Sequence, residues 1–189
     1  MKTKTISFTH AGVLSLNDTS ANIFVIFLGS LLISILAQIS ILLPFSPVPI
    51  TGQTIGVVLI GGILGSKRGA LSVLSYLGQG ALGFPVFAQM KSGANVLIGP
   101  TAGYLWGFVI AAFIIGLLAE KGLTLKPISS FLSCFIATTI ILILGTIYLA
   151  VFKMTFNEAM AMGFYPFLVG DVIKSYICAI LLLSIRKIN

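Results

Sequence analysis

Charged side chains are scarce in this sequence. Only 8% of its 189 residues are Asp, Glu, Lys or Arg, and the acids number four, whereas 58% of the residues are hydrophobic. The mean hydropathy of +1.14 lies far above the range of soluble globular chains. We therefore expect an integral membrane protein, which has the lipid bilayer as its surroundings and almost no domain outside it.

The sequence is equally poor in side chains that catalyse reactions or bind metals. Its one histidine, His10, lies in the polar N-terminal segment, and its two cysteines, Cys134 and Cys178, lie inside apolar runs. An intramembrane enzyme needs a nucleophile beside a base, and the apolar runs offer no histidine and no suitably placed second acid. We expect no enzymatic activity, no metal site and no cofactor, and we interpret the cysteines as small packing residues.

Two glycine-rich segments match nucleotide-binding motifs only superficially. Residues 65–69 read Gly-Ser-Lys-Arg-Gly, which lacks the Gly-Lys-Ser/Thr order of a phosphate-binding loop. Residues 78–83 match Gly-x-Gly-x-x-Gly, but they follow a predicted membrane helix rather than a strand. Because no ATP-binding motif is present, the energy for any transport has to come from a source other than ATP hydrolysis by this chain.

Apolar runs separated by polar or proline-rich turns predict the membrane topology. We predict an all-α membrane protein, a six-transmembrane-helix bundle that forms one domain over residues 22–189 after a polar tail of residues 1–21. The predicted helices cover residues 22–43, a short segment that begins near 51–55 and ends at 64, and residues 70–80, 100–119, 129–152 and 166–183.

The basic residues between these helices orient the bundle. With the N-terminus inside, eight of them fall on the cytoplasmic side and only Lys91 and Lys153 fall outside, as the positive-inside rule requires. Both termini are therefore predicted to be cytoplasmic, and the net charge of +7 reflects orientation rather than binding to nucleic acid. The inner residues are Lys2, Lys4, Lys67, Arg68, Lys121, Lys126, Arg186 and Lys187.

This orientation gathers polar residues at one outward-facing mouth. Three prolines between 44 and 49 exclude a regular helix there, and irregular backbone at membrane depth is tolerated where it is buried or lines a cavity. The half-apolar connection 83–100 is expected to lie over the bundle. We predict an extracellular small-molecule pocket. Its candidate polar residues are Thr51, Gln53, Gln89, Asn95, Tyr104, Asp171 and Lys174.

Asp171 and Lys174 are the ionisable residues of the last apolar segment. Pro166 suits the first turn of a helix, which places both residues within about 12 Å of the predicted helix entrance. They are three residues apart, so they share a helix face and can pair. Intramembrane charges are costly and often functional, but a structural clasp in which Lys174 snorkels towards the interface is an equal alternative.

Five short segments, taken together, carry a family resemblance. They are Pro47-Val-Pro-Ile-Thr51-Gly-Gln53-Thr, Gly69-Ala, Gly83-Phe-Pro-Val-Phe, Gly99-Pro-Thr-Ala-Gly103-Tyr104 and Pro166-Phe-Leu-Val-Gly170-Asp171-Val-Ile-Lys174. In this order and spacing they resemble the BioY family, the biotin-specific substrate-binding (S) components of energy-coupling factor (ECF) vitamin transporters. The resemblance covers about residues 22–187.

The resemblance implies a multi-pass protein of the cell membrane that captures biotin from outside the cell. Its partners would be a transmembrane coupling protein and two ABC-type ATPases, and ATP hydrolysis would take place on those ATPases. An S component for another vitamin is the nearest alternative. A small proton- or ion-conducting bundle that uses the two charges of the last helix as a relay is a more distant one.

The resemblance also implies roles for individual residues of the pocket. Asp171 would accept a hydrogen bond from a ureido N–H of biotin, and Lys174 would donate to the ureido carbonyl. Thr51 and Gln53 would complete the polar contacts to this ring. Tyr104 would pack against the thiophane ring, although an interfacial aromatic belt explains a tyrosine there as well.

The valerate carboxylate of biotin needs hydrogen-bond donors of its own. The connection 83–100 offers three polar side chains near the mouth, Gln89, Lys91 and Asn95. The resemblance implies three candidates for binding the carboxylate: Asn95, Lys91 or the backbone near Gly99.

A further pair of small residues lies on the first predicted helix. Ser30 and Ser34 form a small-xxx-small face that allows close approach of another helix. The family docks on its coupling protein through an Ala-xxx-Ala face of this helix, so the resemblance implies partner docking at the two serines. Ordinary packing inside the bundle is the alternative.

Overall fold

The computed structural model describes residues 7–8, 13–15, 19–152 and 154–187. Most of the predicted polar tail, with Lys2, Lys4 and His10, lies outside these residues, as does Lys153. Within the tail, strands β1 (Ser7–Phe8) and β2 (Leu14–Ser15) pair antiparallel. The first helix begins at Thr19, so the tail is slightly shorter than predicted.

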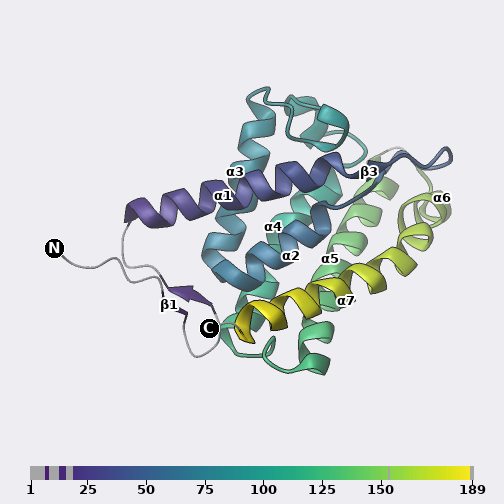
Figure 1. Ribbon diagram of the computed structural model, residues 1–189. Coiled ribbons are helices and arrows are strands. Elements are labelled where there is room, and N and C mark those ends of the chain that lie inside the picture. Colours follow the sequence, from purple (N-terminus) through teal and green to yellow (C-terminus); the bar gives the residue numbers. More distant parts are fainter. Residues whose placement is uncertain (1–6, 9–12, 16–18, 153, 188–189) are drawn as a thin grey trace.

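Helices make up most of the described chain. The longer ones are α1 (Thr19–Gln38), α2 (Gln53–Leu64), α3 (Ser66–Ala81), α4 (Ala102–Glu120), α5 (Pro127–Phe152) and α7 (Tyr165–Lys187). The long connection contains two 3-10 turns, η1 (Ala88–Met90) and η2 (Ala94–Leu97). In the bundle, α4 packs against α2, α3 and α5, while α1 covers α2 and α3 and α7 covers α2 and α5 (Figure 1).

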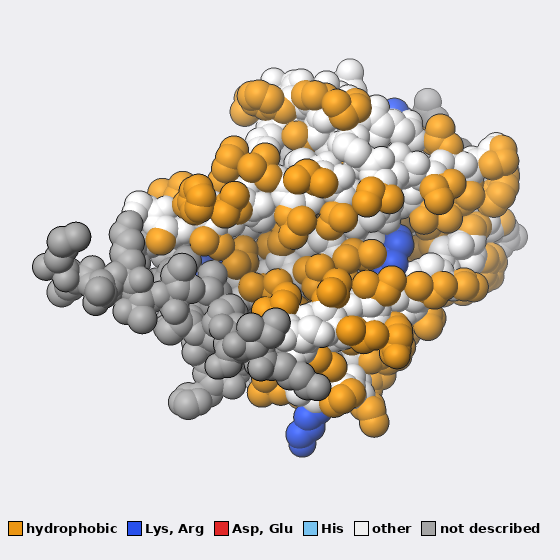
Figure 2. Space-filling view, in the orientation of Figure 1, with side chains coloured by type: hydrophobic (Ala, Val, Ile, Leu, Met, Phe, Trp, Pro, Cys, Tyr) orange, Lys and Arg blue, Asp and Glu red, His pale blue; other side chains and the backbone are white. Residues whose placement is uncertain are grey.

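In the part of the chain that the structure describes, four helical segments are long and apolar enough to cross a membrane. They are Thr19–Gln38, Ala102–Glu120, Pro127–Phe152 and Phe156–Ile185. Hydrophobic side chains cover much of the visible outer face, and blue basic side chains are few (Figure 2). A water-soluble monomer rarely exposes apolar surface on this scale, so the arrangement fits a multi-pass membrane protein.

The predicted end of the first helix is wrong. The apolar run continues to residue 43, but α1 ends at Gln38, and strand β3 (Ser40–Ile41) then pairs antiparallel with β4 (Ile50–Thr51). The proline-rich segment is therefore the tip of a β-hairpin, which leads directly into α2. Hydropathy alone could not show this, because a paired strand satisfies its backbone as well as a helix does.

The predicted start of the last helix is also wrong. Instead of starting at Pro166, the helical segment begins with α6 (Phe156–Ala159) and continues through the π-helical turn η3 (Met160–Phe164) into α7 without a break. Thr155 caps this helix in a capping box with Glu158. Asp171 consequently lies about 22 Å along the helix at 1.5 Å per residue, near the middle of the span rather than close to its entrance.

Side chains from other elements compensate for the proline inside this helix. Pro166 has no N–H to donate to the carbonyl four residues earlier, which belongs to Met162. Ser46 Oγ donates to Met162 O at 2.7 Å, and Tyr104 Oη donates to Gly163 O at 2.8 Å. These two bonds hold the hairpin and α4 against the outer part of the last helix.

Ser30 and Ser34 face the inside of the molecule. Ser30 has no exposed surface and Ser34 is 8% exposed. Gln79 Nε2, from α3, donates to Ser30 Oγ at 2.7 Å, and Ser34 Oγ donates to the carbonyl of Ser30 at 2.9 Å. The small-residue face of α1 thus allows α3 to pack closely against it within the same chain, as the alternative of ordinary packing inside the bundle requires. Neither hydroxyl is open to a partner in this conformation.

Candidate functional site

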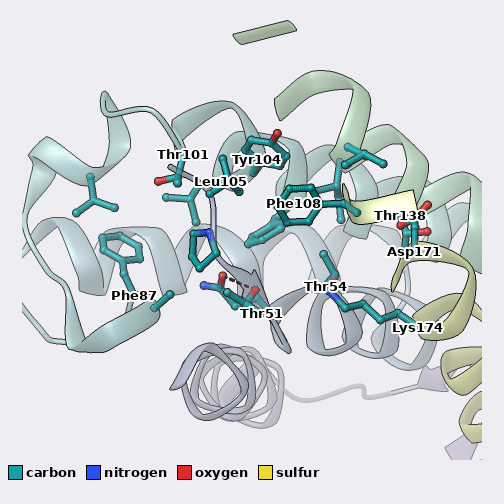
Figure 3. A pocket seen from close by; sticks show the side chains of 18 of the residues that line it. Thr51, Thr54, Phe87, Thr101, Tyr104, Leu105, Phe108, Thr138, Asp171 and Lys174 are labelled. Atoms are coloured by element: carbon teal, nitrogen blue, oxygen red, sulfur yellow. Dashed lines mark hydrogen bonds between the residues drawn. The ribbon is translucent and has the colours of Figure 1, made fainter. Parts of the chain in front are cut away.

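A cavity lies where the hairpin, α2, the long connection, α4, α5 and α7 meet (Figure 3). About 100 Å³ of it is open to the centre of a water molecule. One water occupies roughly 10–15 Å³ by this measure, so the cavity has room for a small organic molecule. Six of the eight predicted ligand-binding residues line it: Thr51, Gln53, Lys91, Tyr104, Asp171 and Lys174.

The other two predicted ligand-binding residues do not line the cavity. Gln89 and Asn95 belong to the same connection as Lys91, but the local backbone turns them elsewhere. Gln89 and Met90 have positive φ angles of 62° and 57°, which L-residues adopt only under constraint. Gln89 Nε2 is buried without a hydrogen-bond partner among the described residues, and Asn95 is exposed.

Apolar and aromatic side chains form most of the wall. Tyr104, Leu105 and Phe108 from α4 and Phe167 from α7 line the cavity, and the Tyr104 and Phe167 ring centroids are 6.4 Å apart. Tyr104 fits closely beside Gly145, where an added Cβ would come within 2.2 Å of its ring. Because the Tyr104 hydroxyl is bound to Gly163 O, this residue offers its ring face to a ligand.

Asp171 is held at one end of the cavity by hydroxyl groups of α5. Its side chain is 7% exposed, and its Oδ2 accepts a hydrogen bond from Thr139 Oγ1 at 3.1 Å. Ser175 Oγ donates to the backbone carbonyl of Asp171 at 2.7 Å and lies 2.9 Å from Thr138 Oγ1. Sequence reasoning missed these threonines, although two adjacent hydroxyl residues inside an apolar run were a usable signal.

The Lys174 side chain points away from the carboxylate of Asp171, which lies one turn earlier in α7. Figure 3 shows its side chain extended towards Thr54 on α2, while Asp171 lies beside Thr138. Within the described part of the chain, no ion pair joins Asp171 to Lys174. The structure therefore does not contain the clasp that their spacing allowed, and both charged residues line the cavity.

A hydrogen-bonded chain fixes the amide of Gln53, which is 5% exposed. Thr51 Oγ1 donates to Gln53 Oε1 at 3.0 Å, and Gln53 Nε2 donates to Tyr76 Oη. Tyr76, from α3, is fully buried and was not identified from the sequence. Hydroxyl groups thus hold both ends of the Gln53 amide, which fixes the position of this side chain at the cavity wall.

The long connection is tied down over the cavity at Phe87. This residue is 2% exposed and packs edge-on against Tyr76, with ring centroids 5.4 Å apart. Gln38 Nε2 contacts the carbonyls of Val86 and Phe87 at 3.4 and 3.3 Å, and Gln38 Oε1 accepts from Met90 N at 3.1 Å. As predicted, the connection lies over the bundle.

The cavity combines hydrogen-bond donors and acceptors with a flat apolar wall. Asp171 supplies a hydrogen-bond acceptor, Lys174 and Lys91 supply donors, and the aromatic residues of α4 and α7 supply the wall. This set suits a small, partly apolar molecule that carries both donors and acceptors on one rigid group.

Comparison with known proteins gives consistent results. A family model described as the BioY family matches residues 4–189. A biotin transporter BioY of Thermotoga maritima is 43% identical over 159 residues, covering 84% of this chain and 91% of that protein. A probable biotin transporter BioY of Pyrococcus horikoshii is 41% identical over 144 residues, covering 76% and 83%.

A solved structure has the same fold. The crystal structure of the S-component for biotin from an ECF-type ABC transporter superposes with a TM-score of 0.82. The match covers 96% of this chain and 95% of that chain at 24% sequence identity.

Proposed function

The chain belongs to the BioY family, and we propose that it is the biotin-binding substrate-capture (S) subunit of an ECF-type ABC importer. One observation carries this proposal. Asp171 and Lys174 lie in the middle of a membrane-spanning helix, are not paired with each other, and both line a cavity with aromatic walls. Buried charges are costly in a membrane, and a ligand that hydrogen-bonds to both gives them a function.

The chemistry of biotin matches the two ends of the cavity. The ureido ring carries two N–H donors and one carbonyl acceptor, which correspond to Asp171 and Lys174. The thiophane ring would pack against Tyr104, and Gln53 with Thr51 would complete the polar contacts. Lys91, which lines the cavity from the long connection, is our candidate for the valerate carboxylate. Gln89 and Asn95 would need a rearrangement of that connection to reach the ligand.

The proposal includes a membrane topology and partners. We propose six membrane spans, in which the shorter helices α2 and α3 count as two, with both termini in the cytoplasm and the cavity open to the outside of the cell. A transmembrane coupling protein and two ABC-type ATPases would complete the importer. ATP would be hydrolysed on those ATPases, and this chain would act as a transport subunit rather than an enzyme.

Uptake of labelled biotin tests this assignment. The chain would be expressed in a biotin-auxotrophic bacterial host that lacks its own biotin importer, with and without a coupling protein and its ATPases. We expect biotin uptake that an Asp171→Asn change reduces strongly. Uptake of thiamine or riboflavin in place of biotin would support an S component for another vitamin, and ion conductance without vitamin uptake would support the relay alternative.

A further inference from the structure

One buried hydroxyl in the cavity has no partner. Among the described residues, three side-chain polar atoms are buried without a hydrogen bond: Thr54 Oγ1, Gln89 Nε2 and Ser130 Oγ. Of these three residues, only Thr54 lines the cavity. A buried polar atom without a partner is costly, and such an atom at the wall of a binding cavity is explained if the ligand supplies the missing partner.

The position of Thr54 in its helix explains why its hydroxyl is free. A threonine inside a helix usually donates to the carbonyl four residues earlier. Thr54 is the second residue of α2, and the residue four positions earlier, Ile50, belongs to strand β4. No helical carbonyl is therefore in place to accept from Thr54 Oγ1.

The neighbouring polar groups of the wall are already engaged. Thr51 Oγ1 donates to Gln53 Oε1, and Gln53 Nε2 donates to Tyr76. Tyr104 Oη donates to Gly163 O. Thr54 Oγ1 differs from these groups, because it is buried and no hydrogen bond among the described residues uses either its donor or its acceptor capacity.

Figure 3 places Thr54 beside the end of the Lys174 side chain, with Asp171 further along the same wall. We propose that Thr54 binds the second ureido N–H of biotin, which donates to Thr54 Oγ1. This inference rests on the proposed function. A cyclic urea presents N–H, carbonyl and N–H in a row, and the three groups would then meet Asp171, Lys174 and Thr54 respectively.

Two substitutions at Thr54 separate the hydroxyl from the shape of the side chain. Thr54→Val keeps the size and removes the hydroxyl, whereas Thr54→Ser keeps the hydroxyl and removes a methyl group. By titration calorimetry of the purified chain in detergent, we expect biotin affinity to fall about five- to thirtyfold in Thr54→Val and to stay within about threefold of wild type in Thr54→Ser. Equal losses in both variants, or none in Thr54→Val, would overturn the proposal.

Biotin analogues locate the contact on the ligand. The probes are the two isomers of biotin methylated at one ureido nitrogen, and biotin methyl ester, which is altered at the valerate end. If Thr54 binds one ureido N–H, one N-methyl isomer should lose less affinity in Thr54→Val than in wild type, while the ester should lose the same in both. Equal losses for both isomers in the two proteins would contradict it.

The outcome also separates this inference from the proposed function. If wild-type protein does not bind biotin, the proposed function fails, and the role of Thr54 fails with it. If wild-type protein binds biotin and Thr54→Val binds it equally well, only the role of Thr54 fails.

Discussion

At the scale of single residues, the proposed binding site centres on Asp171, which lines the cavity. A charged side chain at the centre of a bilayer costs roughly 2.5–3.5 kcal/mol on insertion scales. Thr139 offsets part of this cost by donating to Asp171 Oδ2, and that same bond aims the carboxylate. The carboxylate can accept further hydrogen bonds from a ligand. Binding of that ligand should therefore be sensitive to loss of the Asp171 charge.

The first prediction is that Asp171→Asn weakens biotin binding about tenfold to a hundredfold. Asparagine keeps the size of the side chain but loses a charge-assisted acceptor, which contributes roughly 1.5–3 kcal/mol. Titration calorimetry in detergent measures the effect.

Glu158→Gln is the matched control for this change. It removes the same charge at the exposed start of the same helix, outside the cavity, and should leave affinity unchanged. Wild-type affinity in Asp171→Asn would remove Asp171 from the binding site.

The second prediction concerns Tyr76. This residue is bonded to Gln53 and would affect ligand binding only by positioning Gln53. Tyr76→Phe removes the hydroxyl that accepts from Gln53 Nε2 and leaves the ring in place against Phe87. The Gln53 amide can then rotate, and biotin affinity should fall about two- to tenfold.

A double-mutant cycle with Gln53→Met distinguishes positioning from general destabilisation. Once Gln53 is absent, Tyr76→Phe should have no further effect on affinity. Tyr148→Phe is the control, because its hydroxyl bonds to Ile98 O at an exposed site. Fully additive losses from Tyr76→Phe and Gln53→Met would mean that Tyr76 acts independently of Gln53.

At the scale of secondary-structure elements, the last helix shows where sequence reasoning succeeded and failed. An acid and a base three residues apart in an apolar segment identified Asp171 and Lys174 as residues of interest. Pro166 predicts a helix start, because a single sequence does not reveal that Ser46, far away in the chain, donates to the carbonyl of Met162. The true start had a local signal, Thr155-x-x-Glu158, which fits a capping box.

The third prediction follows from that long-range bond. Ser46→Ala leaves the Met162 carbonyl without its side-chain donor inside a helix that already contains a proline. We expect the free energy of unfolding in detergent to fall by about 1–3 kcal/mol, as measured by thermal melting. Ser129→Ala, which removes an exposed bond to Lys126 O, should change it by less than about 0.5 kcal/mol, and equal effects of the two changes would refute the role of Ser46.

The long connection could be predicted only in part. Its half-apolar composition indicated a segment lying over the bundle, and its position next to the fourth helix placed it at the mouth. Which side chains enter the cavity depends on the left-handed conformations of Gln89 and Met90 and on the contacts from Gln38. Composition does not encode these features, so Lys91 lines the cavity while Gln89 and Asn95 do not.

At the scale of the whole molecule, composition and the order of apolar runs were sufficient to identify a helical membrane protein with a pocket built from distant segments. One cavity is formed by the hairpin, the long connection and the last helix. These elements are separated by up to about a hundred residues of sequence. Composition did not indicate which helices cross the membrane fully. Among the described residues, four segments reach the length and hydropathy of a span, whereas α2 and α3 are short helices joined by a tight turn at Gly65 (φ 85°).

Docking of a partner at Ser30 and Ser34 stays a prediction, and in this conformation the two residues pack inside the bundle. Both residues are buried against α3, so the exposed side of α1 consists of large apolar residues such as Phe24, Phe27 and Leu31. In a membrane this side meets either lipid or another membrane protein, and substitution of the two serines would disturb the bundle itself.

The most direct test of the account is titration of vitamins into the purified chain alone, in detergent, by calorimetry or by quenching of Trp106 fluorescence. Biotin, thiamine and riboflavin would be compared under the same conditions. Since the cavity is formed within one chain, we predict saturable one-to-one binding of biotin and no binding of the other two. Absence of biotin binding, or binding of another vitamin in its place, would contradict the central claim that this cavity is a biotin site.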